Sequence, residues 1–175
     1  IRKLDALKIS PARKRIWGFS DMTSLQNYLY LRAGLPWVHS PMLTSNAFQK
    51  PDGAPESKQW EHGTHRRFKV RALKVTGAAG RALDRKISKL PKSAPILGGN
   101  LTCLASLAAT SARHFPKKDF VLFLEDVAER HYRLDRMLTL LESAGFFKHC
   151  RAIFLGYFTD CPGWKGMFQA WAAEH

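Results

Sequence analysis

The pattern of apolar and polar positions predicts strands that alternate with helices. Apolar runs predict four strands, at residues 15–19, 35–39, 120–124 and 152–158. Apolar residues spaced near 3.6 predict three main helices, at residues 20–32, 101–112 and 132–143. Strands and helices that alternate in this way are typical of an α/β fold with a largely parallel sheet.

Weaker patterns fill part of the remaining chain. Residues 1–9 predict a short helix that ends before Pro11, and the alternation over residues 68–75 predicts a half-buried strand. Gly34 and Gly145 stand where glycines end helices. Residues 90–93 (LPKS) are the most linker-like stretch and predict a domain boundary.

Composition changes this picture only a little. The chain has 175 residues, of which 45% are hydrophobic, enough for one compact domain or two small ones. No apolar run is long enough to span a membrane, and the first residues do not resemble a signal peptide. Three widely spaced cysteines without a C-x-x-C pair argue against a disulfide framework or a zinc knuckle. We therefore expect a reducing, cytoplasmic location.

The positive charge is concentrated in the first half of the sequence. Residues 1–90 hold 18 basic and 6 acidic residues, whereas residues 91–175 hold 10 and 8. Residues 66–92 are the densest stretch, with Asp84 as their only acid. Such a stretch could bind nucleic acid, a lipid surface or an anionic polymer. Because no nucleic-acid motif accompanies it, we favour a solvated basic face.

Ser20 lies where an apolar segment meets a predicted helix. A serine there would present its hydroxyl at the carboxyl edge of the sheet, where the sites of α/β proteins form. The N–H of Asp21 would have no partner within the helix and could stabilise an oxyanion. This is the logic of a nucleophile elbow, although the second glycine of G-x-S-x-G is missing. This segment alone favours Ser20 as a helix cap.

Two acidic residues, Glu125 and Asp126, follow the apolar run 120–124. Glu125 could accept a hydrogen bond from a histidine and fix its tautomer, as the acid of a catalytic triad does. Adjacent side chains point to opposite faces of a strand, so only one of the two acids can meet a site. The segment alone favours solvated loop acids or a helix cap.

Other polar residues give weaker indications. Gly98-Gly99-Asn100 predicts a tight turn from a strand into a helix, with Asn100 as N-cap. The seven histidines include no H-x-x-x-H pair, so we expect no metal site, and we expect no cofactor. We expect His39 to be a surface or locally bonded residue.

Taken together, six segments resemble one family. Residues 18–25 (GFSDMTSL) look like G-(Y/F)-S-D-x-T-x-L, the nucleophile motif of the LD-carboxypeptidases and the related microcin-immunity peptidases. The other five resemble the family's F-H-G-P-M, G-G-N-L, F-L-E-D-x-x-E, Y-R-I-D-R-M-L and F-T-x-C, and they are residues 38–42, 98–101, 123–129, 132–138 and 158–161. Ser40 stands where the family usually has glycine. The order of the six motifs makes the resemblance specific.

The resemblance implies a serine carboxypeptidase that removes the terminal D-alanine from murein tetrapeptides. It implies that Ser20 is the nucleophile, that Glu125 orients a histidine and that the Asp21 N–H donates to the oxyanion. We expect substrate contacts from Asn100 and from Trp60, which lies in the variable segment 44–69. The resemblance also implies a homodimer.

We expect a Rossmann-like N-terminal part with the nucleophile elbow over residues 1–91 and a second α/β domain over residues 92–175. The family's R-G-G-Y-G stretch is absent before Ser20, and residues 162–175 lack the motif of the catalytic histidine. We therefore expect the triad histidine beyond residue 175, and an inactive protein if the chain is complete.

Two alternatives stay open at this point. One is an immunity-type peptidase that cleaves a peptide-nucleotide antibiotic. The other is an inactive basic module that binds nucleic acid or another polyanion through residues 66–92, although we consider a nucleic-acid partner improbable and expect no membrane partner. The same residues could instead attract the carboxylates of muropeptides, the substrate that we expect.

Overall fold

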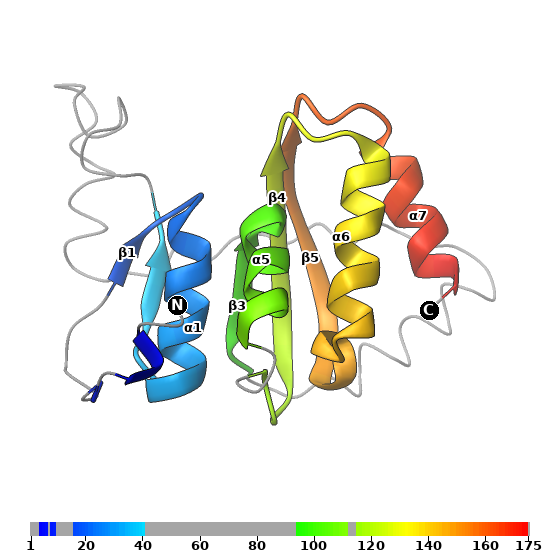
Figure 1. Ribbon diagram of the computed structural model, residues 1–175. Helices are drawn as coiled ribbons and strands as arrows, with labels where there is room; N and C mark the ends of the chain where they lie inside the picture. Colours follow the sequence, from blue (N-terminus) through cyan, green and yellow to red (C-terminus); the bar gives the residue numbers. More distant parts are fainter. Residues whose placement is uncertain (1–3, 7, 10–15, 41–93, 112–114, 175) are drawn as a thin grey trace, which may run out of the picture. The chain divides into compact units, whose positions relative to one another are not determined.

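Parallel strands organise the described part of the chain, residues 4–6, 8–9, 16–40, 94–111 and 115–174 of the computed structural model (Figure 1). One sheet pairs β1 (Ile16–Gly18) with β2 (Trp37–His39). The other has the order β3-β4-β5, formed by Ile96–Asn100, Phe120–Val127 and Cys150–Thr159. Each pair of neighbours is parallel, so the predicted α/β class is confirmed.

The three main predicted helices are present with small shifts of their ends. They are α1 (Met22–Ala33), α5 (Leu101–Ser111) and α6 (His131–Ser143). Gly34 ends α1 as predicted, at φ 66°, and its N–H donates to Tyr30 O over 2.8 Å. The structure describes η1 (Leu4–Ala6) within the helix predicted over residues 1–9. No helix in the described residues has the length and apolar character of a membrane span.

Two further elements were not predicted, namely the short helix η4 (Phe146–His149) and α7 (Trp164–Glu174). The start of α7 packs through its aromatic rings against β5. Trp164 stacks on Phe158 with ring centroids 4.9 Å apart, and Phe168 lies 5.0 Å from the same ring. The spacing of Trp164, Phe168 and Trp171 was a signal for this helix.

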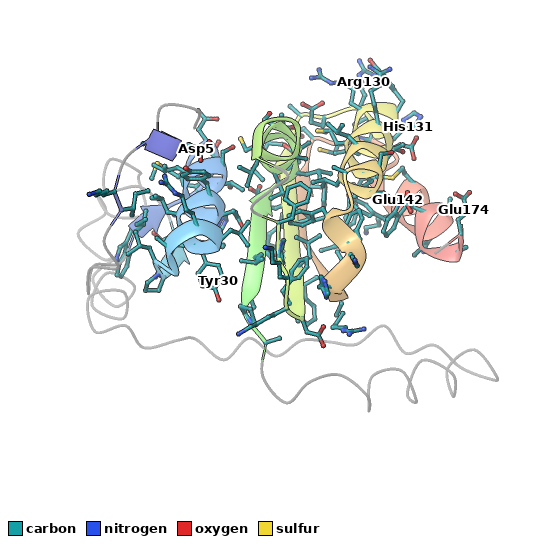
Figure 2. All side chains as sticks on the ribbon, turned by 60° about the horizontal axis from the view of Figure 1, so that its bottom comes forward. Asp5, Tyr30, Arg130, His131, Glu142 and Glu174 are labelled. Atoms are coloured by element: carbon teal, nitrogen blue, oxygen red, sulfur yellow. The ribbon has the colours of Figure 1, made fainter. Side chains whose placement is uncertain are left out.

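The core fixes the position of β4. Phe120, Leu122 and Leu124 alternate along this strand and are fully buried. They share one apolar cluster with side chains of α5 and α6, which lie side by side against the sheet (Figures 1 and 2). Burying each such side chain contributes about 1.5–3 kcal/mol. The side chains at alternate positions, Phe123 and Glu125 among them, therefore point to the other face.

Two predicted boundaries are wrong. The strand β4 continues to Val127, so Glu125 and Asp126 lie within it instead of following it. Gly98 and Gly99 belong to β3 instead of a turn, because both pack too closely for a side chain. A Cβ on Gly98 would lie 2.0 Å from Phe123 O, and one on Gly99 would lie 2.6 Å from Thr23 Oγ1. Asn100 is the N-cap of α5 as predicted, since its Oδ1 accepts from Cys103 N over 3.0 Å.

The buried side of α1 is polar, although its apolar residues have helical spacing. Thr23, Gln26 and Asn27 are all fully buried. The Asn27 side chain pairs with Gly98 as a peptide group would, with both hydrogen bonds at 2.8 Å. Thr23 Oγ1 accepts from Asn100 N over 3.0 Å. These bonds join α1 to β3, and both elements belong to one compact unit.

The remaining predictions fall on residues that are not described. They concern the strand over residues 68–75, the linker at residues 90–93 with the boundary between 91 and 92, the basic stretch 66–92, and Trp60.

Candidate active site

Ser20 occupies a strained turn between β1 and α1. Its φ is 55°, in the left-handed region, which costs a residue other than glycine about 1 kcal/mol or more. Two hydrogen bonds close the turn, from Met22 N to Phe19 O over 3.2 Å and from Thr23 N to Ser20 O over 2.9 Å. The N-cap residue is Asp21, so the interpretation of Ser20 as the cap is wrong. Strain of this kind is typical of functional sites.

The backbone N–H of Asp21 is available beside Ser20. The next two N–H groups of the chain donate within the turn, whereas that of Asp21 has no acceptor among the described residues. This N–H lies at the positive end of α1, where partial charge and a free donor favour an anion. The arrangement is suited to stabilising an oxyanion formed at the Ser20 hydroxyl.

Glu125 lies near the carboxyl end of β4, in register with Asn100 of β3. Its Oε1 is buried and has no hydrogen-bond partner among the described residues. Burial raises the pKa of Glu125, and the charge of Asp126 raises it further, while the neighbouring Asn100 amide lowers it. A buried carboxylate oxygen without a partner is a strong acceptor for a donor that approaches it.

A β-bulge widens β5 opposite Glu125. Leu124 pairs with Leu155 and Asp126 pairs with Phe158, so Gly156 and Tyr157 together face the single residue Glu125. A Cβ on Gly156 would lie 2.8 Å from the Phe123 ring and 3.3 Å from Glu125 Cβ. Bulges often occur beside active sites, where they redirect side chains. Here the bulge leaves Tyr157 87% exposed.

The Asp126 side chain lies on the opposite face of β4 from that of Glu125. It is 3% exposed and accepts hydrogen bonds from Asn100 Nδ2 over 2.8 Å, Thr102 N over 3.0 Å and Thr102 Oγ1 over 2.9 Å. It therefore caps the first turn of α5. The prediction that the two acids point to opposite faces is confirmed.

Cys103, in the first turn of α5, connects the elbow with the acids. Its Sγ lies 3.6 Å from Asp21 Oδ1. Burial raises the pKa of the Cys103 thiol to about 11, and the charges of Asp21, Asp126 and Glu125 raise it too. Cys103 thus joins the elbow to the start of α5, whose N-cap Asn100 is in register with Glu125.

His39 is half-buried at the end of β2. It is in register with Gly18 of β1, and its ring meets Phe123 edge-on with centroids 5.4 Å apart. Its Nδ1 is buried without a hydrogen bond among the described residues, and burial lowers its pKa. His39 as a whole is half-buried, and its Nδ1 lacks the local bond that we expected. The position of His39 at the end of the apolar segment 35–39 could have indicated this burial.

The described residues do not supply the whole predicted site. No cluster of three or more His, Cys, Asp or Glu in this part of the chain could hold a metal ion. The unpartnered atoms of His39 and Glu125, Nδ1 and Oε1, do not bond each other. Asn100 is 8% exposed and its amide is engaged by Asp126, and Trp60 lies outside the described residues.

Comparisons with known proteins agree on one family. Residues 93–174 match the LD-carboxypeptidase C-terminal domain. A murein tetrapeptide carboxypeptidase of Pseudomonas aeruginosa is 32% identical over 152 residues, which cover 83% of this chain and 46% of that protein. A putative carboxypeptidase of Streptomyces coelicolor is 32% identical over 150 residues, with 85% of this chain and 45% of that protein covered. The chain thus spans about half the length of these relatives.

A solved structure extends the agreement to three dimensions. The crystal structure of muramoyltetrapeptide carboxypeptidase from Oxalobacter formigenes has a TM-score of 0.59 at 25% identity, over 91% of this chain and 54% of that one. The wild-type apo form of the microcin C7 self-immunity protein MccF has a TM-score of 0.61 at 21% identity, over 93% of this chain and 57% of that one. At this identity the second likeness shows the fold alone.

Proposed function

We propose that this chain, which belongs to the LD-carboxypeptidase family, carries the nucleophile and the acid of a serine carboxypeptidase. The substrate is a murein tetrapeptide, from which the intact protein removes the terminal D-alanine. The names of the Pseudomonas aeruginosa and Oxalobacter formigenes relatives support this substrate class. The observation that carries the proposal is the strained Ser20 turn with the unengaged Asp21 N–H beside it.

The proposed reaction passes through an acyl-enzyme. Ser20 Oγ attacks the carbonyl carbon of the last peptide bond while a histidine takes its proton, and the Asp21 N–H donates to the oxyanion. The histidinium then gives the proton to the amine of the leaving D-alanine. Water, activated by the same histidine, hydrolyses the ester and frees Ser20. In this proposal the histidine comes from outside the described residues.

Glu125 acts on that histidine in the proposed mechanism. Its unpartnered Oε1 accepts the imidazole N–H and fixes the tautomer that can take the Ser20 proton. Its negative charge stabilises the imidazolium that forms in the transition state. The features that raise the pKa of Glu125 make its carboxylate a better acceptor for this bond.

The predictions for Asn100, Trp60, the homodimer and the cytoplasmic location remain proposals. The Asn100 side chain donates to Asp126 and accepts from Cys103 N, so we propose a supporting role for it. The contact by Trp60, the homodimer and the cytoplasmic location stay predictions. The likeness to MccF shows the fold alone and gives the immunity-type alternative no specific support.

Release of D-alanine from a murein tetrapeptide by the intact protein tests the proposal. Mass spectrometry follows the free D-alanine for the wild type, for Ser20→Ala and for the control Ser143→Ala, whose exposed serine ends α6. We expect release by the wild type and the control, and a loss of several orders of magnitude in Ser20→Ala. An active Ser20→Ala variant would contradict the assignment of the nucleophile. Cleavage of a peptide-nucleotide and not of the tetrapeptide would favour the immunity-type alternative.

A further inference from the structure

The helix α1 bonds β3 through polar side chains (Figure 1). Gly98 directs both its N–H and its C=O to the Asn27 side chain, with each hydrogen bond at 2.8 Å. Two residues further along the strand, Asn100 N donates to Thr23 Oγ1 over 3.0 Å. The two side chains thus meet the backbone of β3 as the backbone of a neighbouring strand would.

The spacing of these contacts is the same on both elements. Four residues of a helix rise about 6 Å, and two residues of a strand advance about 6.6 Å. Thr23 and Asn27, four positions apart, therefore match Asn100 and Gly98, two positions apart. Thr23 and Asn27 are fully buried, so a shift of α1 along β3 would leave buried polar groups without partners. The match fixes the position of α1 along the strand.

Thr23 comes closer to β3 than a side chain at residue 99 would permit. A Cβ on Gly99 would lie 2.6 Å from Thr23 Oγ1 and 3.1 Å from Thr23 Cγ2. The φ of Gly99, 125°, is also one that other residues rarely adopt. This glycine therefore leaves room for both the hydroxyl and the methyl group of Thr23.

Thr23 also belongs to the turn of the proposed nucleophile. Its backbone N–H donates to Ser20 O over 2.9 Å, while its hydroxyl accepts from Asn100 N. Asn100 is in register with Glu125 across β3 and β4. Thr23 therefore connects the Ser20 turn to the strand residue that pairs with the proposed acid. Ser20 follows β1 and Glu125 lies in β4, two strands of different sheets, so their relative position depends on such a connection.

We propose that Thr23 is a positioning residue, which fixes the Ser20 turn against Asn100 of β3 and so sets the nucleophile relative to Glu125. The inference rests on the proposed roles of Ser20 and Glu125. Thr23 itself is fully buried and touches neither substrate nor histidine in this account. Its two bonds can be separated, because Thr23→Val retains the backbone N–H that closes the turn and removes the hydroxyl that accepts from Asn100.

Tetrapeptide hydrolysis and urea unfolding of the intact protein test the proposal in Thr23→Val, Thr23→Ser and Ser24→Ala. Thr23→Ser keeps the hydroxyl. Ser24→Ala is the matched control, because the Ser24 hydroxyl also joins α1 to a distant part of the chain by one hydrogen bond, to Cys103 O of α5 over 2.7 Å. A misplacement of about 1 Å can cost about 100-fold in rate. We expect kcat to fall about 10- to 100-fold in Thr23→Val with KM unchanged, and to stay near the wild-type value in the other two variants.

Two further measurements do not depend on turnover. The Asn100 amide hydrogen should exchange faster in Thr23→Val than in the wild type or Thr23→Ser, because it loses its acceptor. Crystal structures should show Ser20 displaced relative to Glu125 in Thr23→Val and in its wild-type place in Ser24→Ala. If Thr23→Val only lowers stability, as Ser24→Ala does, and leaves kcat and the position of Ser20 unchanged, the bond is structural and the proposal is wrong.

Two other outcomes also decide the question. If Thr23→Val does not fold, Thr23→Ala replaces it, and an unchanged kcat in that variant overturns the proposal. If the wild type does not hydrolyse the tetrapeptide, the proposed function is wrong. In that case the crystal structures decide this inference, since a displaced Ser20 in Thr23→Val supports it and an unmoved Ser20 contradicts it.

Discussion

Glu125 and Asp126 are neighbours in β4, yet their carboxylates lie in opposite environments. Asp126 is 3% exposed and satisfied by donors from β3 and α5, whereas Glu125 keeps a buried oxygen without a partner among the described residues. The strand's alternation produces this difference, because Asp126 falls on the side of the core and Glu125 on the side of Phe123 and Gly156. Substitutions at the two positions should therefore have different consequences.

Glu125→Gln should abolish most turnover and make the protein more stable at neutral pH. Burial and Asp126 raise the folded-state pKa of Glu125 above its ordinary value of 4.5, so the folded state binds this proton more tightly than the unfolded state. Stability is therefore lost as pH rises from about 4.5 through the folded-state pKa. Urea unfolding should show a gain for Glu125→Gln at pH 7 that vanishes near pH 4. A loss at pH 7 would contradict this electrostatic account.

Asp126→Asn should destabilise the fold by about 1–3 kcal/mol, because the new amide cannot accept all the hydrogen bonds that the carboxylate receives. Asp135→Asn is the matched control, since Asp135 is exposed in α6, and it should change stability by no more than about 0.5 kcal/mol. Thermal or urea unfolding measures both. Equal effects at the two positions would mean that the hydrogen bonds of Asp126 contribute nothing to stability.

Ser20→Gly should be more stable than Ser20→Ala by about 1 kcal/mol, although both variants should lack activity. Ser20 has φ 55°, a conformation that glycine adopts without strain and alanine does not. A serine retained at such a position at the expense of stability is expected at a functional site. If Ser20→Gly proves less stable than Ser20→Ala, the turn does not carry this strain.

Gly156→Ala should lower both stability and kcat. The added Cβ would lie 2.8 Å from the Phe123 ring and 3.3 Å from Glu125 Cβ, so these side chains must move. The expected loss is about 1–3 kcal/mol. Gly166→Ala is the control, because Gly166 lies in α7 with open space around it and should gain about 0.5–1 kcal/mol in helix propensity. Unchanged activity in Gly156→Ala would show that the bulge does not shape the site.

Local signals in the sequence predicted the elements that depend on local physics. Gly34 ends α1 and Asn100 caps α5 as predicted, since both roles are set within a few residues. Gly98 and Gly99 were wrongly assigned to a turn. Glycines are needed at these strand positions because Phe123 and Thr23, which are distant in the sequence, approach the backbone closely. The bulge at Gly156 depends likewise on the pairing of β4 with β5.

The sequence proposes candidate site residues but not the contacts around them. Motifs select Ser20 and Glu125 as candidates, and strand alternation separates Glu125 from Asp126. The bonds from Asn27 to Gly98 and from Asn100 to Thr23 join residues more than 70 positions apart, and no pattern along the chain encodes them. The partial burial of His39 was not predicted for a related reason, because His39 contacts Phe123 of the other sheet.

The measurement that tests the central claim most directly is a double-mutant cycle between Ser20 and Glu125 in the intact protein. It compares kcat for murein tetrapeptide hydrolysis in the wild type, Ser20→Ala, Glu125→Gln and the double variant. Residues that act as one catalytic unit have strongly non-additive effects, since the loss of the nucleophile makes the acid irrelevant. We predict that the double variant is no slower than Ser20→Ala alone. Losses that multiply in the double variant would show that the two residues act independently and would contradict a shared active site.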